Sequence, residues 1–300
     1  MRKYISRLYR LLFWPVYAFI NQKLQNNEVQ LRAISQISQQ QLVSTYQQEK
    51  ILEIPPKKLH QIGFKQYSEN NEDGVLLYIF SIIGTTNRKC VEIGSGYGNE
   101  CNSANLIVHH NWHGLLIDSG SVQIKHAQKF FKWALNKEAE RPQIAQIHIT
   151  RDNVNSVIEQ AGFSGEIDLL SIDIDGVDYW IWKEIEVCKP RVVVVEIQCI
   201  RKSSESVTVP YHDQFEPGFV DGYGIYSGAS LAAFNKLAKQ KGYRFIGVEQ
   251  SGYNAFFLRN DVSADYFSEE DITVIDQLPF VVWARKQFYD RIIDKEWINV

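Results

Sequence analysis

The chain has 300 residues, enough for one large domain or two small ones, and 45% of them are hydrophobic, enough for a sizeable core. Its formal net charge of -3 and sequence pI of about 6.2 do not favour a nucleic-acid partner, because such proteins are usually basic or carry a basic stripe. Its four cysteines lack the spacing of a zinc site, a thioredoxin motif or a disulfide framework. A reducing cytoplasm is therefore the expected compartment.

The N-terminal segment combines basic side chains with a short apolar run. Arg2, Lys3, Arg7 and Arg10 precede an apolar stretch from 11 to 20. This stretch is too short to span a bilayer, and no small-residue cleavage site follows it. Two interpretations remain open. Residues 1–20 either lie in a membrane interface, with their basic side chains toward the headgroups, or form a helix docked on the domain or a partner chain.

Residues 22–52 are rich in Gln and read as one helix. A coiled-coil seam through Leu24 and Leu31 would continue at Ser38 and Thr45, which are polar, so we interpret the segment as a stalk or packing helix and leave the oligomeric state open. Pro55-Pro56 ends this helix. Three parts are predicted: an N-terminal segment with a helical stalk (1–55), a main domain (56–262) and a C-terminal helical extension (263–300).

Strand-like and helical segments alternate through the main domain. Strands are expected at 89–94, 114–117, 144–149, 167–173 and 191–197, and helices near 98–109, 122–138, 153–161, 178–187 and 228–241. This alternation predicts a parallel sheet with helices on both faces. The final strand-like runs, in YRFIGVEQSGYNAFFLRND, are separated only by a Ser-Gly turn. No crossover helix fits there, so these two strands must be antiparallel.

Three glycines follow the first predicted strand in VEIGSGYGNE. Gly94 and Gly96 match the G-x-G-x-x-G dinucleotide fingerprint, but Asn99 stands at its third position and Gly98 comes one residue early. Glycines here tolerate positive φ and let a ligand approach the backbone. Asp118 ends the next strand, where a carboxylate accepts hydrogen bonds from ribose hydroxyls. The alternative is a glycine turn that serves only the strand–helix junction.

These motifs resemble those of class I S-adenosylmethionine (SAM) methyltransferases. The E-x-G-x-G-x-G spacing resembles their motif I, and the terminal hairpin resembles their fold, an α/β doubly wound, mostly parallel seven-stranded Rossmann-like sheet. With NWHGLLIDSG, TRDNV, IDLLSIDIDGVDYWIW and SVTVPYH, residues 60–260 resemble the FkbM-like group of O-methyltransferases. The resemblance implies SAM as cofactor and a hydroxyl acceptor on a sugar, glycan or small natural product.

The same resemblance assigns a set of cofactor-binding residues. It implies that the methionyl part of SAM lies along the glycine loop, that an acid two residues earlier holds its amino group, that Asp118 binds the ribose, and that the residues after the third strand flank the adenine. In this sequence the remaining positions are Glu92, Gly94, Ser95, Gly96, Asp152 and Asn153.

An acidic stretch, SIDIDGVDY, follows the fourth strand at the sheet edge where ligands bind. Asp173 and Asp175 are two apart, so along a strand they would share a face. The stretch also resembles the D-x-D segment of divalent-metal O-methyltransferases, which implies Mg²⁺ or Mn²⁺ held by Asp173, Glu196 and Gln198. Those enzymes carry an Asp-Asn pair where this chain has Glu196-Ile197-Gln198.

A metal-free mechanism is the alternative for the same stretch. Asp175, or His212 in the long insertion after the fifth strand, would then act as general base. In the plainest interpretation Asp175 or Asp178 only caps the following helix.

The sequence thus predicts a SAM-dependent O-methyltransferase. It would act on a small-molecule or glycan acceptor, without a nucleic-acid partner, in the cytoplasm, with peripheral membrane contact through residues 1–20 as an open possibility. A nucleotide-binding oxidoreductase is one rival, disfavoured by the misplaced third glycine and the terminal hairpin. A non-catalytic SAM-fold scaffold is another, disfavoured because Glu92, Asp118 and Asp173 are retained.

Overall fold

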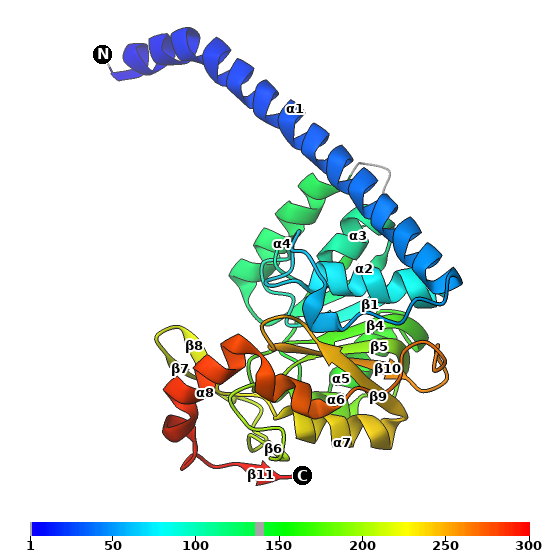
Figure 1. Cartoon of the computed structure of the whole chain (residues 1–300). Helices are drawn as coiled ribbons and strands as arrows, with labels where there is room; N and C mark the ends of the chain where they lie inside the picture. The colour runs from blue at the N-terminus through cyan, green and yellow to red at the C-terminus, as the bar shows by residue number, and fades with distance from the viewer. Residues whose placement is uncertain (1, 136–140) are drawn as a thin grey trace.

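The computed structural model describes residues 2–135 and 141–300; within the first helix, side chains are described at 16, 18–20, 22–23, 27 and from 29 onward. That helix, α1 (Arg2–Ile51), includes both the apolar N-terminal run and the Gln-rich stretch. Figure 1 shows its C-terminal half lying on the domain and its N-terminal half projecting away. Gln39 exchanges two hydrogen bonds of 3.0 and 2.9 Å with Asn105, and Tyr46 packs edge-on against Tyr78, so α1 docks through its second half.

A seven-stranded sheet forms the centre of the domain, in the order β3-β2-β1-β4-β5-β10-β9. The strands β1 (Lys89–Ile93), β2 (His113–Asp118), β3 (Gln143–Gln146), β4 (Gly165–Ile172) and β5 (Cys188–Glu196) are parallel. The strand β10 (Asn254–Arg259) runs antiparallel between β5 and β9 (Tyr243–Val248). This confirms the predicted mostly parallel sheet with its antiparallel hairpin. The strand order reverses between β1 and β4, which creates a topological switch point.

Helices cover both faces of this sheet (Figure 1). One face carries α2 (Glu72–Ile83), α3 (Ala104–His110) and α4 (Ser121–Ala134). The other carries α5 (Val154–Gln160), α6 (Asp178–Glu184) and α7 (Leu231–Lys241). In β5, Val192 and Val194 join the first core and Val193 and Val195 the second, which explains why this strand is apolar without alternation.

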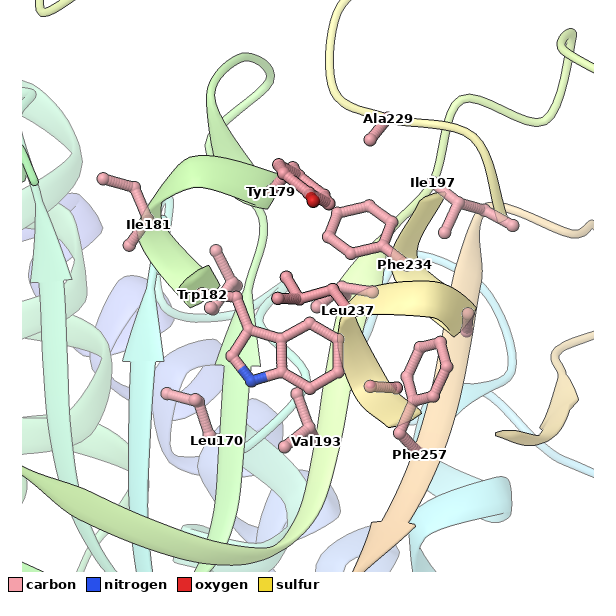
Figure 2. Close-up of a cluster of buried hydrophobic side chains, with 14 of the residues drawn as sticks. Leu170, Tyr179, Ile181, Trp182, Val193, Ile197, Ala229, Phe234, Leu237 and Phe257 are labelled. Atoms are coloured by element: carbon pink, nitrogen blue, oxygen red, sulfur yellow. The ribbon is translucent and has the colours of Figure 1, made fainter. Parts of the chain in front are cut away.

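The core under α6 and α7 fixes the start of the acidic turn. Trp182 is buried with its ring centroid 6.0 Å from that of Phe234 on α7 and 5.2 Å from that of Phe257 on β10 (Figure 2). Because α6 is anchored by this large side chain, the residues between β4 and α6 are held firmly at the sheet edge.

Smaller elements surround the main sheet. They are η1 (Leu59–Gln61), β6 (Val207–Thr208), β7 (Gly218–Val220), β8 (Tyr223–Tyr226), η2 (Ile272–Gln277), α8 (Pro279–Ile292) and β11 (Ile298–Asn299). The C-terminal extension is therefore helical only in part, because its last residues pair with β6. Its helix α8 packs on β8 through Phe288 and Ile292 against Ile225. Among the described residues, none of the helices has the length and apolar character needed to cross a membrane.

Candidate active site

A cavity of about 420 Å³ opens at the carboxyl edge of the sheet, around the switch point between β1 and β4. Its wall includes the loops that follow β1, β2 and β4 and the first residue of β10. The predicted site residues that line it are Glu92, Gly94, Ser95, Gly96, Asp118, Asp173 and Asp175. The predicted residues that do not line it are Asp152, Asn153, Glu196, Gln198 and His212.

The glycine loop is a tight turn tied to β2. The backbone N–H groups of Gly94 and Ser95 both donate to the carbonyl oxygen of Ile117, at 2.8 and 3.1 Å. Gly94 has a φ of +89°, and a Cβ there would lie 1.6 Å from the carbonyl oxygen of Asp173. This position therefore requires glycine, because the loops after β1 and β4 touch through their backbones.

Gly98 has a different function from the first two glycines. A Cβ at this position would lie 2.8 Å from the Cβ of Ala127 on α4. The third glycine thus permits close packing of a helix, the function that the dinucleotide fingerprint gives to a glycine one residue later. The turn continues to Ser103, so α3 begins at Ala104, later than the sequence predicted.

Asp118 is placed by hydrogen bonds from two backbone groups. Its Oδ2 accepts from the N–H of Gly96 at 2.9 Å, and its Oδ1 accepts from the N–H of Gly120 at 2.7 Å. A carboxylate has about four lone-pair sites, so both oxygens keep capacity for a ligand's hydroxyls. The side chain therefore links the glycine loop to the cavity wall at the end of β2.

Glu92 is buried beneath the glycine loop. Its Oε1 accepts from the N–H of Asn102 at 2.7 Å, and its Oε2 accepts from the N–H of Ser103 at 2.9 Å and from the Ser103 hydroxyl. Burial raises the pKa of this carboxyl, while the Ser103 and Asn102 donors lower it. Glu92 thus holds the turn after the glycine loop and also lines the cavity.

Asp173, Asp175 and Glu196 form the acid cluster. One carboxylate oxygen from each lies within 4.8 Å of the others. The expected reason was wrong: β4 ends at Ile172, so Asp173 and Asp175 do not share a strand face. They meet because the chain turns sharply at Asp175, whose φ is +52°.

The turn that carries Asp175 is held by Asp178, the first residue of α6. Its carboxylate accepts from the N–H groups of Ile174 and Gly176, at 2.8 and 3.0 Å. Burial raises its pKa to about 6, against these hydrogen bonds, which lower it. Asp178 therefore holds the turn before α6, whose N-cap residue Val177 has no side-chain cap hydrogen bond, while Asp175 lines the cavity.

The electrostatics of the acid cluster follow from burial and like charge. Burial, and then neighbouring carboxylates, raise the pKa values of Asp173 and Glu196 well above their usual range. Burial also raises the pKa of Asp175. Three converging oxygen ligands suit Mg²⁺ or Mn²⁺, so the acid cluster fits a divalent cation.

Gln198 does not complete that set. Its Nε2 donates to the carbonyl oxygens of Gly224 and Ser227, at 3.3 and 3.4 Å, and its Oε1 accepts from the N–H of Ile200 at 3.4 Å. The amide is engaged with the backbone of the insertion, which argues against the predicted metal-ligand role.

The insertion reaches the cavity, but His212 does not line it. His212 is exposed, and its Nδ1 accepts from the N–H of Gln214 at 3.1 Å. Asp213 and Phe215, beside it in the same loop, line the cavity. The long insertion therefore contributes to the cavity through residues other than His212.

The loop after β3 also places neighbours of the predicted residues at the cavity. Asp152 is exposed. The Asn153 side chain accepts from the N–H of Thr150 at 2.8 Å and donates to the carbonyl oxygen of His148 at 2.9 Å. Asn153 thus shapes the loop, while His148 and Ile149 line the cavity.

Asn254 and Glu69 also line the cavity, and neither was predicted from the sequence. Asn254 begins β10 and lies opposite Glu196 in the strand register. The Asn254 Oδ1 and the Ser95 Oγ are buried, and neither has a hydrogen-bond partner among the described residues. Unpartnered polar atoms in a cavity wall indicate a place for a polar ligand.

The cavity lining is strongly acidic. Its carboxylates are Glu69, Glu92, Glu100, Asp118, Asp173, Asp175 and Asp213. No Lys or Arg side chain lines it within residues 2–135 and 141–300. Such a lining repels anionic ligands and attracts cationic ones.

No protein-family model matches the chain, and no curated protein sequence matches it significantly. Solved structures similar to it include a magnesium protoporphyrin IX methyltransferase from Synechocystis with bound SAM, at 11% identity and a TM-score of 0.35, covering 57% of this chain and 69% of that one. A SAM-dependent methyltransferase from Clostridium acetobutylicum has 13% identity and a TM-score of 0.38, covering 61% and 87%. A mitomycin 7-O-methyltransferase has 17% identity and a TM-score of 0.35, covering 59% and 50%. These values are too low to assign a family, so membership of the FkbM-like group stays a prediction.

Proposed function

We propose that the protein is a SAM-dependent methyltransferase that methylates a hydroxyl of a sugar, glycan or small natural product. The main support for this proposal is that the glycine loop, Asp118 and two members of the acid cluster all line the same cavity. SAM has a sulfonium and an ammonium group against one carboxylate, so it suits an acidic cavity. The pyrophosphate of a dinucleotide would face the same carboxylates without a Lys or Arg partner among the described lining residues, which disfavours the oxidoreductase alternative.

The lining residues fit the parts of SAM in order. The backbone of Gly94, Ser95 and Gly96 would hold the methionyl part, and Asp118 would accept from the ribose hydroxyls. We assign the adenine side to His148 and Ile149, in place of Asp152 and Asn153. The unpartnered Ser95 hydroxyl offers one further hydrogen bond to a ligand.

The acid cluster is proposed to act on the acceptor hydroxyl. When bound, SAM supplies a methyl carbon made electrophilic by the sulfonium, so that transfer to a hydroxyl breaks the C–S bond, forms an O–C bond and releases the hydroxyl proton. Asp175 is the group that takes this proton. Its raised pKa makes it a stronger base than an ordinary carboxylate at neutral pH. A divalent cation in the acid cluster is the alternative, because it would lower the pKa of the acceptor hydroxyl instead.

Calorimetric titration of the full chain with SAM and with NAD⁺ tests the proposal. SAM should bind and NAD⁺ should not. Binding of NAD⁺ without SAM would overturn the proposal in favour of an oxidoreductase. Binding of SAM without methyl transfer to any hydroxyl acceptor in a broad panel would instead identify a scaffold.

A further inference from the structure

The cavity holds more carboxylates than the cofactor accounts for. The proposed function assigns Asp118 to SAM, which carries one net positive charge, and both oxygens of Glu92 already accept hydrogen bonds from Asn102 and Ser103. Glu69, Asp173 and Asp175 also line the cavity, and Glu196 completes the acid cluster behind them. These carboxylates interact electrostatically. The pKa of Glu69 is raised by burial and then by carboxylates that include Asp175. Glu69 in turn raises the pKa values of Asp173 and Glu196.

Within the described residues, the side-chain oxygens of Asp173, Asp175 and Glu196 neither accept a hydrogen bond nor form an ion pair with Lys, Arg or His. Glu69 differs, because the ammonium of Lys65 donates to its backbone carbonyl oxygen at 2.6 Å and lowers the pKa of its carboxyl. Asp173 and Glu196 are half-buried, whereas Asp175 is exposed. Half-buried carboxylates are usually paired, because leaving such a charge without a partner is costly. A positively charged ligand group would supply the missing partner.

Asn254 gives independent evidence for a ligand here. Its Nδ2 donates to Glu72 Oε1 at 2.9 Å, and Glu72 also accepts from the N–H of Asn70 at 2.9 Å. The carboxylate of Glu72 therefore sets the orientation of the Asn254 amide and leaves its Oδ1 without a partner. Asn254 is only 4% exposed and lines the cavity, so its Oδ1 awaits a hydrogen-bond donor from a ligand.

We propose that the acceptor carries a protonated amine near the hydroxyl that is methylated, and that Asn254 Oδ1 and the acid cluster hold this ammonium. This inference rests on the proposed function and specifies its substrate class as an amine-bearing hydroxyl compound such as an amino sugar. An ammonium group brings three donors and one positive charge, which matches a wall made of unpaired acceptors. A phosphorylated or carboxylated acceptor would face repulsion from the same wall.

Three hexoses that differ in charge test the inference. The full chain, saturated with S-adenosylhomocysteine (SAH) in EDTA, is titrated with D-glucosamine below the pKa of its amine, with D-glucose and with D-glucuronate. Glucosamine should bind about tenfold more tightly than glucose, as close charge pairs allow, and glucuronate should bind most weakly. SAH formation from SAM should follow the same order.

Two matched variants locate the effect. Asp175→Asn should abolish most of the preference for glucosamine, because it removes one charge while Asn tolerates the positive φ found there. Glu159→Gln, on the exposed face of α5, removes one charge away from the cavity and should keep the preference. Retention of the full preference in Asp175→Asn would overturn the inference.

The remaining outcomes also test the inference. Equal binding of the three hexoses, or binding of none, overturns the inference, and so does a preference for glucuronate. If hexose binding appears only when Mg²⁺ or Mn²⁺ replaces EDTA, the acid cluster is a metal site and the inference fails. SAM and SAH titrations on the same preparation distinguish failure of this inference from failure of the proposed function. If neither SAM nor SAH binds, the proposed function itself is wrong.

Discussion

The carbonyl oxygen of Asp173 occupies the space beside Gly94, at 1.6 Å from the position that a Cβ would take. The loop that is proposed to hold the cofactor and the loop that carries the acid cluster are therefore in direct backbone contact. Any side chain at Gly94 must separate them, so the two halves of the site are structurally coupled.

Gly94→Ala should both destabilise the protein and abolish SAM binding. The matched control is Gly162→Ala, because Gly162 has a similar φ of +81° but no atom within 4 Å of its missing Cβ. The left-handed backbone alone should cost about 1–2 kcal/mol in each variant. Overpacking should add about 1–3 kcal/mol in Gly94→Ala only. Chemical denaturation measures both values, and equal stability of the two variants would show that the loops are not in contact.

Asp175→Asn should lower the rate of methyl transfer about 10²- to 10⁴-fold, the usual contribution of a general base. SAM binding should be retained, because Asp175 faces the acceptor. SAH formation with the amino-sugar acceptor measures the rate, and EDTA should leave it unchanged. Loss of turnover in EDTA, with recovery on adding Mn²⁺, would instead assign Asp173, Asp175 and Glu196 to a metal. A wild-type rate in Asp175→Asn would remove Asp175 from the mechanism.

Local patterns predicted the parts of the site that are continuous in sequence. The glycine loop and Asp118 each directly follow an apolar strand, so their position at the sheet edge follows from the parallel topology alone. The hairpin was predicted as well. The hydrogen-bond partners of Asp118 and Glu92 were not, because they depend on how the turns fold back.

Asn254 and Glu69 could not be placed in the same way. Asn254 reaches the cavity because β10 pairs with β5 in a register that sets it opposite Glu196, and a hairpin motif does not specify its register to another strand. Glu69 lies in an irregular segment before α2, without any periodicity to place it. Gln198 was misplaced for a similar reason: its amide is engaged by the insertion, whose path the sequence does not reveal.

The contribution of Asp73 to the stability of the protein should fall as the pH rises from about 4 to 6. Burial raises the pKa of Asp73 from 3.8 to about 6, against hydrogen bonds from three backbone N–H groups that lower it. A raised pKa means that the folded state keeps a proton that the unfolded state loses. The resulting stabilisation is complete below pH 3.8 and is lost as the pH rises through about 6.

Asp73→Asn isolates this contribution. The variant should flatten the pH dependence of the free energy of unfolding by about 3 kcal/mol across this range, since one pKa unit corresponds to about 1.4 kcal/mol. Chemical denaturation at several pH values gives the curves for wild type and variant. Parallel curves would mean that Asp73 ionises normally in the folded protein.

The projecting half of α1 is proposed to hold a cytoplasmic enzyme at an anionic membrane surface. Val16, Phe19 and Ile20 are 55%, 61% and 50% exposed, and the helix extends away from the domain at this point (Figure 1). The side chains of residues 1–15 lie outside the described residues, so the sequence alone shows that this part of the helix is basic.

Deletion of residues 1–20 should therefore abolish co-sedimentation with vesicles that contain anionic lipid. The domain contacts of α1, such as that of Gln39 with Asn105, lie beyond the deletion, so the fold should survive. Vesicles of neutral lipid should bind the full chain more weakly, because the basic residues then lack their partners. Equal sedimentation of the full and shortened chains would contradict membrane contact.

The most direct test of the central claim is a SAM titration of wild type, Asp118→Asn and Asp152→Asn. Both variants remove one Asp charge near the proposed cofactor, but only Asp118 lines the cavity. Wild type should bind SAM, and Asp118→Asn should bind it more weakly by about 1.5–3 kcal/mol through loss of charge-assisted hydrogen bonds. Asp152→Asn should bind SAM as wild type does. An unchanged dissociation constant in a folded Asp118→Asn variant, or no SAM binding by wild type, would contradict the central claim.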